Sequence, residues 1–145
     1  MSVDDLKTQS EKINDHLKKC LKNFSGRWGA FVSMASEPLV DWKELNLNIQ
    51  WYFVQTEDQK LNFVRDQESL QAQDLDGICI PALGFNLNGA RLGRGGGFYD
   101  REFENYKGNK IGIAFDFAVD PAIPYEAHDI KVDVIVTDRR IVDAA

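Results

Sequence analysis

Cysteines and long hydrophobic runs are both scarce in this chain of 145 residues. Cys20 and Cys79 are its two cysteines, and their separation matches neither a metal-ligand pair nor a CxxC motif. No apolar run is long enough to cross a bilayer, and the polar start, Met1–Asp5, lacks a signal-peptide pattern. We therefore expect a cytoplasmic protein with no membrane segment. Cys79 lies in an apolar run and is expected to be a buried, reduced thiol.

Positive charge is also in deficit, because 17 Lys and Arg stand against 23 Asp and Glu, a net charge of −6. Nonspecific nucleic-acid binding needs a basic surface, so the composition argues against a nucleic-acid partner. The length is sufficient for one hydrophobic core, and the hydrophobic fraction of 43% is ordinary for a globular protein. We expect a single domain over residues 1–145, monomeric or weakly dimeric, that acts on a small molecule.

The apolar pattern predicts an α/β fold. Leu6, Ile13, Leu17, Leu21 and Phe24 share one helical face and predict an amphipathic helix that ends at Ser25–Gly26. Near-continuous apolar strands that alternate with helices indicate a sheet covered on both faces. We therefore predict three layers, with a mostly parallel sheet between helices. Strands are expected at 28–35, 49–54, 60–64, 77–81, 110–115 and 132–137, helices at 41–45 and 98–106, and a polar connection at 65–76.

The most informative segment is Arg91–Arg101, in which glycines cluster between two arginines and a predicted helix start. Glycines let backbone N–H groups converge on one point. Arg91 and Arg94 add guanidinium donors, and the helix start adds a positive dipole end, which together suit a polyphosphate. Asp100, at the edge of the same loop, is suited to hold a phosphate-bound Mg²⁺.

Two widespread phosphate-binding motifs are absent from this loop. No Gly-Lys-Ser/Thr follows it, as a P-loop requires, and Phe98 stands where a dinucleotide fingerprint has its third glycine. The alternative is a flexible surface loop with incidental arginines. Such a loop is expected to be followed by Ser, Asn or Lys rather than by Phe98 and Tyr99.

Acidic residues near later strands are further candidates. His128 and Asp129 precede the last predicted strand, but adjacent residues seldom form the hydrogen bond that joins a general base to its orienting acid. Asp129 fits better as a second Mg²⁺ carboxylate, provided that its loop folds back on Asp100. His128 is equally compatible with a structural hydrogen bond. Asp116, after the strand at 110–115, is interpreted as a solvated turn acid.

Together these segments resemble the 5-formyltetrahydrofolate cyclo-ligase family, whose members are also called 5,10-methenyltetrahydrofolate synthetases. The likeness runs from about Gly77 to Thr137 and rests on Arg91–Asp100, Pro124–Asp129 and Val132–Thr137, in the family's order. It implies an enzyme of one-carbon metabolism that uses Mg-ATP to convert 5-formyltetrahydrofolate to 5,10-methenyltetrahydrofolate, releasing ADP and phosphate. In that reaction the formyl oxygen attacks the γ-phosphate and N10 then closes the ring, so positioning and charge neutralisation matter most.

The resemblance also assigns roles to residues. It implies that Arg94 and Tyr99 are catalytic and that Asp100 and Asp129 hold Mg²⁺. A weaker likeness over residues 31–37 makes Glu37 and Val32 folate-binding candidates, although Glu37 before Pro38 also fits a solvated acid. The ATP site would comprise Arg91, Leu92, Gly93, Arg94, Gly95, Gly96, Gly97, Phe98 and Tyr99, and the folate would also contact Arg94, Gly95, Gly96, Gly97 and Phe98.

Two departures from the family leave other functions open. The first is that nothing here matches the family's Lys-x-x-Leu-Arg motif, which lies on an additional N-terminal helix and contacts ATP. The second is that the middle section, residues 51–76, is shorter than is usual in the family. The runner-up is therefore a relative that binds a nucleotide or a folate without turnover. A third reading is a sugar-phosphate or CoA-handling α/β protein that uses the same anion loop.

Overall fold

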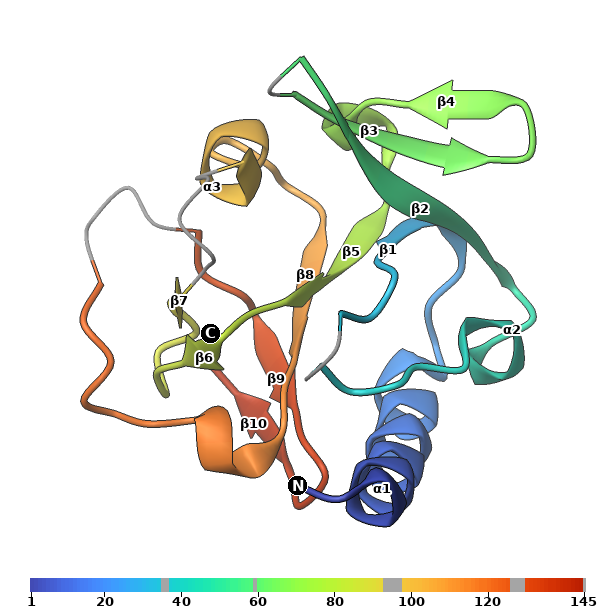
Figure 1. The fold of residues 1–145 in the computed structure, drawn as a ribbon. Coiled ribbons are helices and arrows are strands. Elements are labelled where there is room, and N and C mark those ends of the chain that lie inside the picture. The colour runs from blue at the N-terminus through green and yellow to red at the C-terminus, as the bar shows by residue number, and fades with distance from the viewer. Residues whose placement is uncertain (35–36, 59, 93–97, 126–129, 145) are drawn as a thin grey trace.

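The computed structural model describes residues 1–34, 37–58, 60–92, 98–125 and 130–144. In this part of the chain an eight-stranded sheet runs in the order β10-β9-β8-β5-β1-β2-β3-β4 (Figure 1). Pairing is parallel from β9 to β2 and antiparallel at both edges. The strands are β1 (Gly26–Ala30), β2 (Ile49–Glu57), β3 (Lys60–Arg65), β4 (Glu68–Leu70), β5 (Gly77–Pro81), β8 (Asn109–Ile113), β9 (Val134–Val136) and β10 (Ile141–Asp143).

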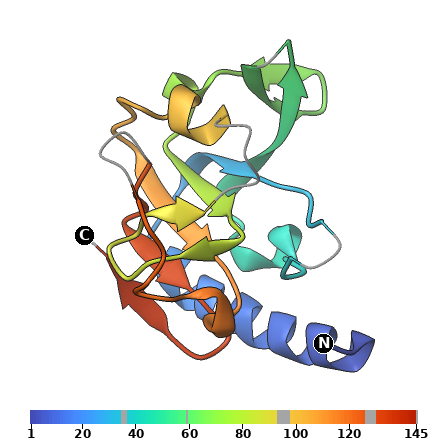
Figure 2. The same cartoon turned by 60° about the vertical axis from the view of Figure 1, so that its left-hand side comes forward.

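Short elements cover both faces of the sheet, which confirms the predicted α/β layers. Helices α1 (Val3–Leu21) and α2 (Trp42–Leu45) lie on one face (Figure 1). Helix α3 (Phe98–Glu102) lies on the other, with the hairpin β6 (Gly84–Phe85) and β7 (Arg91–Leu92) (Figure 2). Among the described residues, no helix combines the length and apolar character that crossing a membrane requires. The 3-10 turns are η1 (Ala72–Asp74) and η2 (Asp116–Ala118).

The first helix follows its predicted pattern. Its N-terminus is capped by Ser2, whose Oγ accepts a hydrogen bond from the Asp5 amide at 3.0 Å. Ile13, Leu17 and Leu21 are fully buried against the sheet. The helix ends at Leu21, earlier than Ser25–Gly26, because Phe24 leaves the helical path to pack on the Trp28 ring, 5.0 Å away.

The central strands alternate their side chains between two apolar clusters. Ile78 and Ile80 face the α3 side, and Cys79 faces the α1 side. Cys79 is 1% exposed, and burial, with a smaller contribution from Cys20, raises the pKa of its thiol well above the ordinary value. The prediction of a buried, reduced thiol is confirmed, since Cys79 forms no disulfide and is buried.

Several predicted boundaries were wrong. The strand expected over 28–35 ends at Ala30, and the helix expected over 98–106 ends at Glu102. The connection expected at 65–76 contains β4 and the 3-10 turn η1, which Gln71 and Asp74 cap reciprocally. Strand β10 and the β6–β7 hairpin were not predicted, because strands of two or three residues are too short for a periodic pattern.

Asp116 is a paired acid rather than a solvated one, which corrects the sequence interpretation. Its Oδ1 accepts hydrogen bonds from Arg140 Nε at 2.8 Å and from Thr137 Oγ1 at 3.0 Å. Burial raises the pKa of this carboxyl, but the Arg140 and Thr137 hydrogen bonds and the charges of Arg140 and Arg139 outweigh burial and lower it below its ordinary 3.8. A carboxyl whose pKa is lower in the folded state stabilises the fold above its unfolded pKa.

We therefore expect Asp116→Asn to lower the free energy of unfolding at pH 7 by at most about 1 kcal/mol, because the Arg140 partner is half exposed. The difference from the unmodified protein should close as the pH falls from about 4 through the lowered pKa. Urea unfolding from pH 2.5 to pH 7 measures this. The control is Asp15→Asn, a change on the exposed face of α1. If Asp116→Asn lowers the free energy of unfolding equally at every pH, the lowered pKa assigned to Asp116 is contradicted.

Candidate functional site

A cavity of about 240 Å³ lies on the α3 side of the sheet, beyond the carboxyl ends of β1 and β5. Ligands of parallel α/β sheets gather at this edge, where neighbouring strands leave a crevice. Its wall combines loop residues after β1 and β5 with side chains of β2, β3, β7 and α3. The lining residues are Phe31, Val32, Met34, Glu37, Val54, Thr56, Leu61, Pro81, Ala82, Arg91 and Tyr99.

Arg91 is held in this wall by the β6–β7 hairpin. The hairpin reverses at Asn86, whose Oδ1 accepts bonds from the Asn88 and Ala90 amides, and at Gly89, which has a φ of +87°. The Arg91 guanidinium donates to the Pro81 carbonyl from Nε at 3.3 Å and from Nη2 at 3.1 Å. A permanent positive charge is thereby anchored at the carboxyl end of β5.

Tyr99 places a phenol beside that guanidinium. Its ring lies 5.0 Å from Arg91 Cζ and stacks on Phe103, with 6.1 Å between the two ring centroids. Burial raises the pKa of the Tyr99 phenol, Arg91 lowers it, and Glu37 raises it, with a net rise above the ordinary 10.0. The phenol is therefore protonated at neutral pH and has a proton to donate in a hydrogen bond.

Glu37 is buried, with 7% of its surface exposed, so the alternative of a solvated acid is wrong. Its Oε1 accepts a hydrogen bond from the Met34 amide at 2.8 Å, and its own amide donates to the Met34 carbonyl at 2.9 Å. These two bonds tie Glu37 to Met34 and hold the carboxylate at the cavity wall. Val32, the other candidate after β1, is 73% exposed at the rim.

Asp100 lies in the first turns of α3 and contacts the segment that precedes β9. Its Oδ1 accepts a hydrogen bond from the Ile130 amide at 2.9 Å. The chain therefore returns to Asp100 at Ile130, one residue after the second predicted metal ligand. Asp129 itself lies outside the described residues. Within the described ranges, no group of three or more His, Cys, Asp or Glu side chains is placed to bind a metal.

The remaining predicted residues divide into two groups. Leu92 is 46% exposed on β7, and Phe98 packs under Arg101, with 5.1 Å from Cζ to the ring. Neither side chain lines the cavity. Gly93, Arg94, Gly95, Gly96, Gly97 and His128 lie outside the described residues, so the phosphate-binding loop stays a prediction.

A neighbouring hollow of about 130 Å³ shares Glu37 and Ala82 with the first cavity. Phe117 lines it, is 74% exposed, and stacks on Phe115 with 5.6 Å between ring centroids and 11° between ring planes. Phe117 was not among the residues predicted from the sequence. The available signal was an aromatic residue four positions after the end of strand β8, in the turn η2.

Comparison with known proteins gives a consistent family match. Residues 54–138 match the model of the 5-formyltetrahydrofolate cyclo-ligase family. The 5-formyltetrahydrofolate cyclo-ligase of Mus musculus is 38% identical over 76 residues, which cover 48% of this chain and 37% of that protein. The enzyme of the same name from Escherichia coli K12 is 36% identical over 78 residues, covering 52% and 43%. The matched part thus spans less than half of these relatives.

Solved structures extend the likeness to nearly the whole chain. A 5,10-methenyltetrahydrofolate synthetase from Mycoplasma pneumoniae superposes with a TM-score of 0.86 at 25% identity, covering 95% of this chain and 90% of that one. The synthetase from Aquifex aeolicus gives a TM-score of 0.79 at 27% identity, covering 99% and 85%. The predicted fold class is confirmed.

Proposed function

Because the chain belongs to the 5-formyltetrahydrofolate cyclo-ligase family, we propose that it converts 5-formyltetrahydrofolate to 5,10-methenyltetrahydrofolate. The conversion would consume ATP with Mg²⁺ and release ADP and phosphate. The observation that carries this proposal is the cavity in which Glu37, Arg91 and Tyr99 meet, although they come from three separate parts of the chain. A buried acid, an anchored cation and a protonated phenol are suitable for a planar folate next to a phosphate.

The folate would enter the cavity with its pterin against the apolar wall. A pterin carries amide and amino N–H donors at one edge, and a carboxylate offers about four acceptor positions to such donors. The bond from Met34 uses one of these positions on Glu37 and holds the carboxylate in place. Phe31, Val54 and Leu61 supply apolar surface on either side.

The phosphates would lie toward Arg91 and the glycine loop. Arg91 is restrained by the Pro81 carbonyl, so its charge is in place before a ligand binds. The Tyr99 phenol, which is protonated at neutral pH, would donate a hydrogen bond to an oxygen that gains negative charge. We assign Arg94 to the transferred phosphoryl group and the loop amides to the remaining phosphate oxygens.

Asp100 and Asp129 would hold the Mg²⁺ that accompanies ATP, since Mg²⁺ prefers one or two carboxylates together with phosphate oxygens. The Ile130 amide orients one oxygen of Asp100, and the other oxygen of that carboxylate suits a metal or a metal-bound water. When bound, the metal neutralises charge on the phosphates.

Turnover is tested by mixing the purified chain with 5-formyltetrahydrofolate, ATP and Mg²⁺ and following the absorbance of the methenyl product. We expect an increase that depends on all three additions and stops when EDTA removes the metal. A chain that yields no product at high enzyme concentration would contradict the proposed activity.

Two other functions remain distinguishable by calorimetry. Binding of 5-formyltetrahydrofolate or ATP without turnover would support the runner-up, a relative that only binds. Binding of a sugar phosphate or CoA that free ATP fails to displace would support the third reading. The family likeness argues against the third reading, whereas the turnover assay decides between the cyclo-ligase reaction and the runner-up.

A further inference from the structure

Glu37 lies on a connecting segment that is held by α1, the helix on the other face of the sheet. The segment leaves β1 after Ala30, at the edge where the candidate cavity lies, and enters α2 at Trp42, in the apolar cluster that α1 also joins (Figure 1). Three backbone groups of the segment, at Leu39 and Asp41, form hydrogen bonds with side chains of α1. The helix is thereby joined to residues that closely follow Glu37.

Asn14 supplies two of these bonds from the middle of α1. Its Nδ2 donates to the Leu39 carbonyl at 2.9 Å, and its Oδ1 accepts from the Asp41 amide at 2.9 Å. Nδ2 also donates to the Ser10 carbonyl at 2.8 Å, one turn earlier in the helix, which orients the side-chain amide. Asparagine is unfavourable inside a helix because it competes for backbone hydrogen bonds. Its use here is compensated by the contact with another segment.

Ser10 completes the contact, because its Oγ accepts a hydrogen bond from the Leu39 amide at 3.0 Å. Ser10 is 2% exposed, whereas the Leu39 side chain is 47% exposed and contributes little packing. The Leu39 backbone is therefore held by polar bonds to α1. Trp42 anchors the far end of the segment separately, since it is buried and its Nε1 donates to the Phe31 carbonyl at 3.1 Å. Loss of the Asn14 amide should thus loosen the segment without unfolding the protein.

The bonds to α1 act on Glu37 through a short and constrained stretch of chain. Leu39 is two positions after Glu37, and the carbonyl of Pro38 between them accepts a hydrogen bond from Ser33 Oγ at 2.5 Å. Glu37 itself is tied to Met34 by two hydrogen bonds, which hold its carboxylate at the cavity wall. A displacement of the Leu39 backbone is therefore carried to the Glu37 carboxylate.

We propose that Asn14 and Ser10 are positioning residues for the folate, which act through the Glu37 carboxylate. The inference rests on the proposed function, in which Glu37 binds the donor edge of the pterin. That edge is bound equally before and during the reaction, so the loss of either side chain raises KM and leaves kcat unchanged. The alternative is that the two residues only attach α2 to α1, in which case their loss lowers stability alone.

Steady-state kinetics of Asn14→Leu, which removes the amide at similar volume, test this role. We expect KM for 5-formyltetrahydrofolate to rise about five- to tenfold, while kcat and KM for ATP change by less than about twofold. Ser10→Ala should raise the same KM by a smaller factor. In a Glu37→Ala background, Asn14→Leu should leave the folate KM unchanged, because no carboxylate is left to position. An equal rise in both backgrounds would overturn the proposal.

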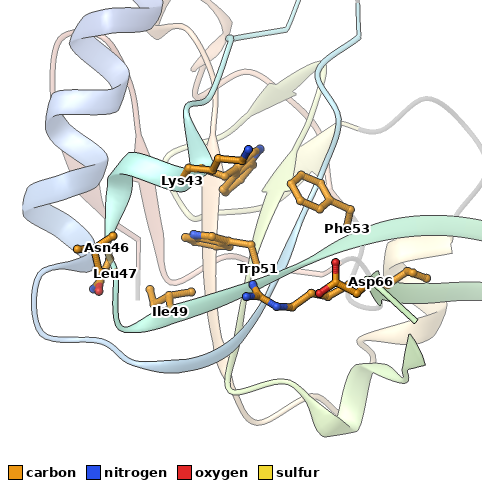
Figure 3. A pocket seen from close by; sticks show the side chains of 10 residues that line it. Lys43, Asn46, Leu47, Ile49, Trp51, Phe53 and Asp66 are labelled. Carbon is orange, nitrogen blue, oxygen red and sulfur yellow. The ribbon is translucent and has the colours of Figure 1, made fainter. Parts of the chain in front are cut away.

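Asn46→Leu is the matched control, because the Asn46 amide also makes three hydrogen bonds to backbone groups, at the end of α1 and ahead of β2. Asn46 lines a separate cavity of about 530 Å³ with Trp51 and Phe53 (Figure 3). That cavity shares no lining residue with the candidate site. Asn46→Leu should therefore lower stability as Asn14→Leu does but leave the folate KM unchanged. The same rise of KM in both variants would contradict a specific role for Asn14.

Amide hydrogen exchange tests the same role without folate or turnover. The Met34 amide donates to Glu37 Oε1, and the Glu37 amide donates to the Met34 carbonyl. Exchange at these two amides should be at least about tenfold faster in Asn14→Leu than in Asn46→Leu. Equal exchange in the two variants would overturn the positioning role, whereas an unmodified chain that forms no methenyl product would overturn the proposed function. The two proposals therefore fail separately.

Discussion

Replacing Arg94 with alanine is expected to lower kcat/KM for the cyclo-ligase reaction by about 10²- to 10³-fold. Phosphoryl transfer depends on fixed positive charge near the moving group, and the proposed function assigns that charge to the Arg94 guanidinium. A loop arginine contributes little to a hydrophobic core, so the melting temperature should change by no more than about 2 °C. Steady-state kinetics and thermal unfolding on the same preparation measure both quantities.

The matched control is Arg139→Ala, which removes the same charge from an exposed position that does not line the candidate cavity. It should retain nearly full activity. Full activity in Arg94→Ala would refute the role assigned to the loop, and an Arg94→Ala protein that does not fold would refute the assignment of Arg94 to a surface loop. Arg94→Lys should recover only part of the rate, because an ammonium lacks the forked geometry of a guanidinium.

Truncation of Phe85 to alanine is expected to lower the free energy of unfolding by about 3–5 kcal/mol. Phe85 is completely buried, and its ring lies so close to β8 that a Cβ added to Gly112 would be 2.5 Å from Cζ. Phe85 also pairs directly with Arg91 across the β6–β7 hairpin. The cavity left by its ring should therefore loosen the strand that carries Arg91 and raise KM in addition to reducing stability.

Urea unfolding and steady-state kinetics at a temperature where Phe85→Ala stays folded separate these two effects. Leu87→Ala, a truncation in the same hairpin at a side chain that is 40% exposed, should cost no more than about 1 kcal/mol and leave KM unchanged. If Phe85→Ala and Leu87→Ala lower the free energy of unfolding by the same amount, the hairpin does not depend on the buried ring.

The elements with strong apolar patterns were predictable from the sequence. Burial on one face of a helix leaves a periodic apolar stripe, and burial on both faces of a strand leaves a continuous apolar run. The α1 stripe of Ile13, Leu17 and Leu21 and the continuous run of β5 are both of this kind. That β5 precedes the glycine loop follows from chain order, although the β6–β7 hairpin between them was not predicted. The residue types of the candidate site, and their likeness to one enzyme family, are likewise properties of the linear chain.

Which remote segments of the chain lie close together could be learned only from the tertiary fold. Nothing in the local sequence indicates that Glu37, Arg91 and Tyr99 share a cavity, that Ile130 bonds to Asp100, or that Asp116 pairs with Arg140. Each contact joins segments whose relative position is set by strand order and by short pairs such as β6–β7. The Trp51 indole N–H is another example, because it is buried without a hydrogen-bond partner among the described residues, and the sequence alone does not indicate this. Residue chemistry is local, whereas burial and proximity are properties of the packed chain.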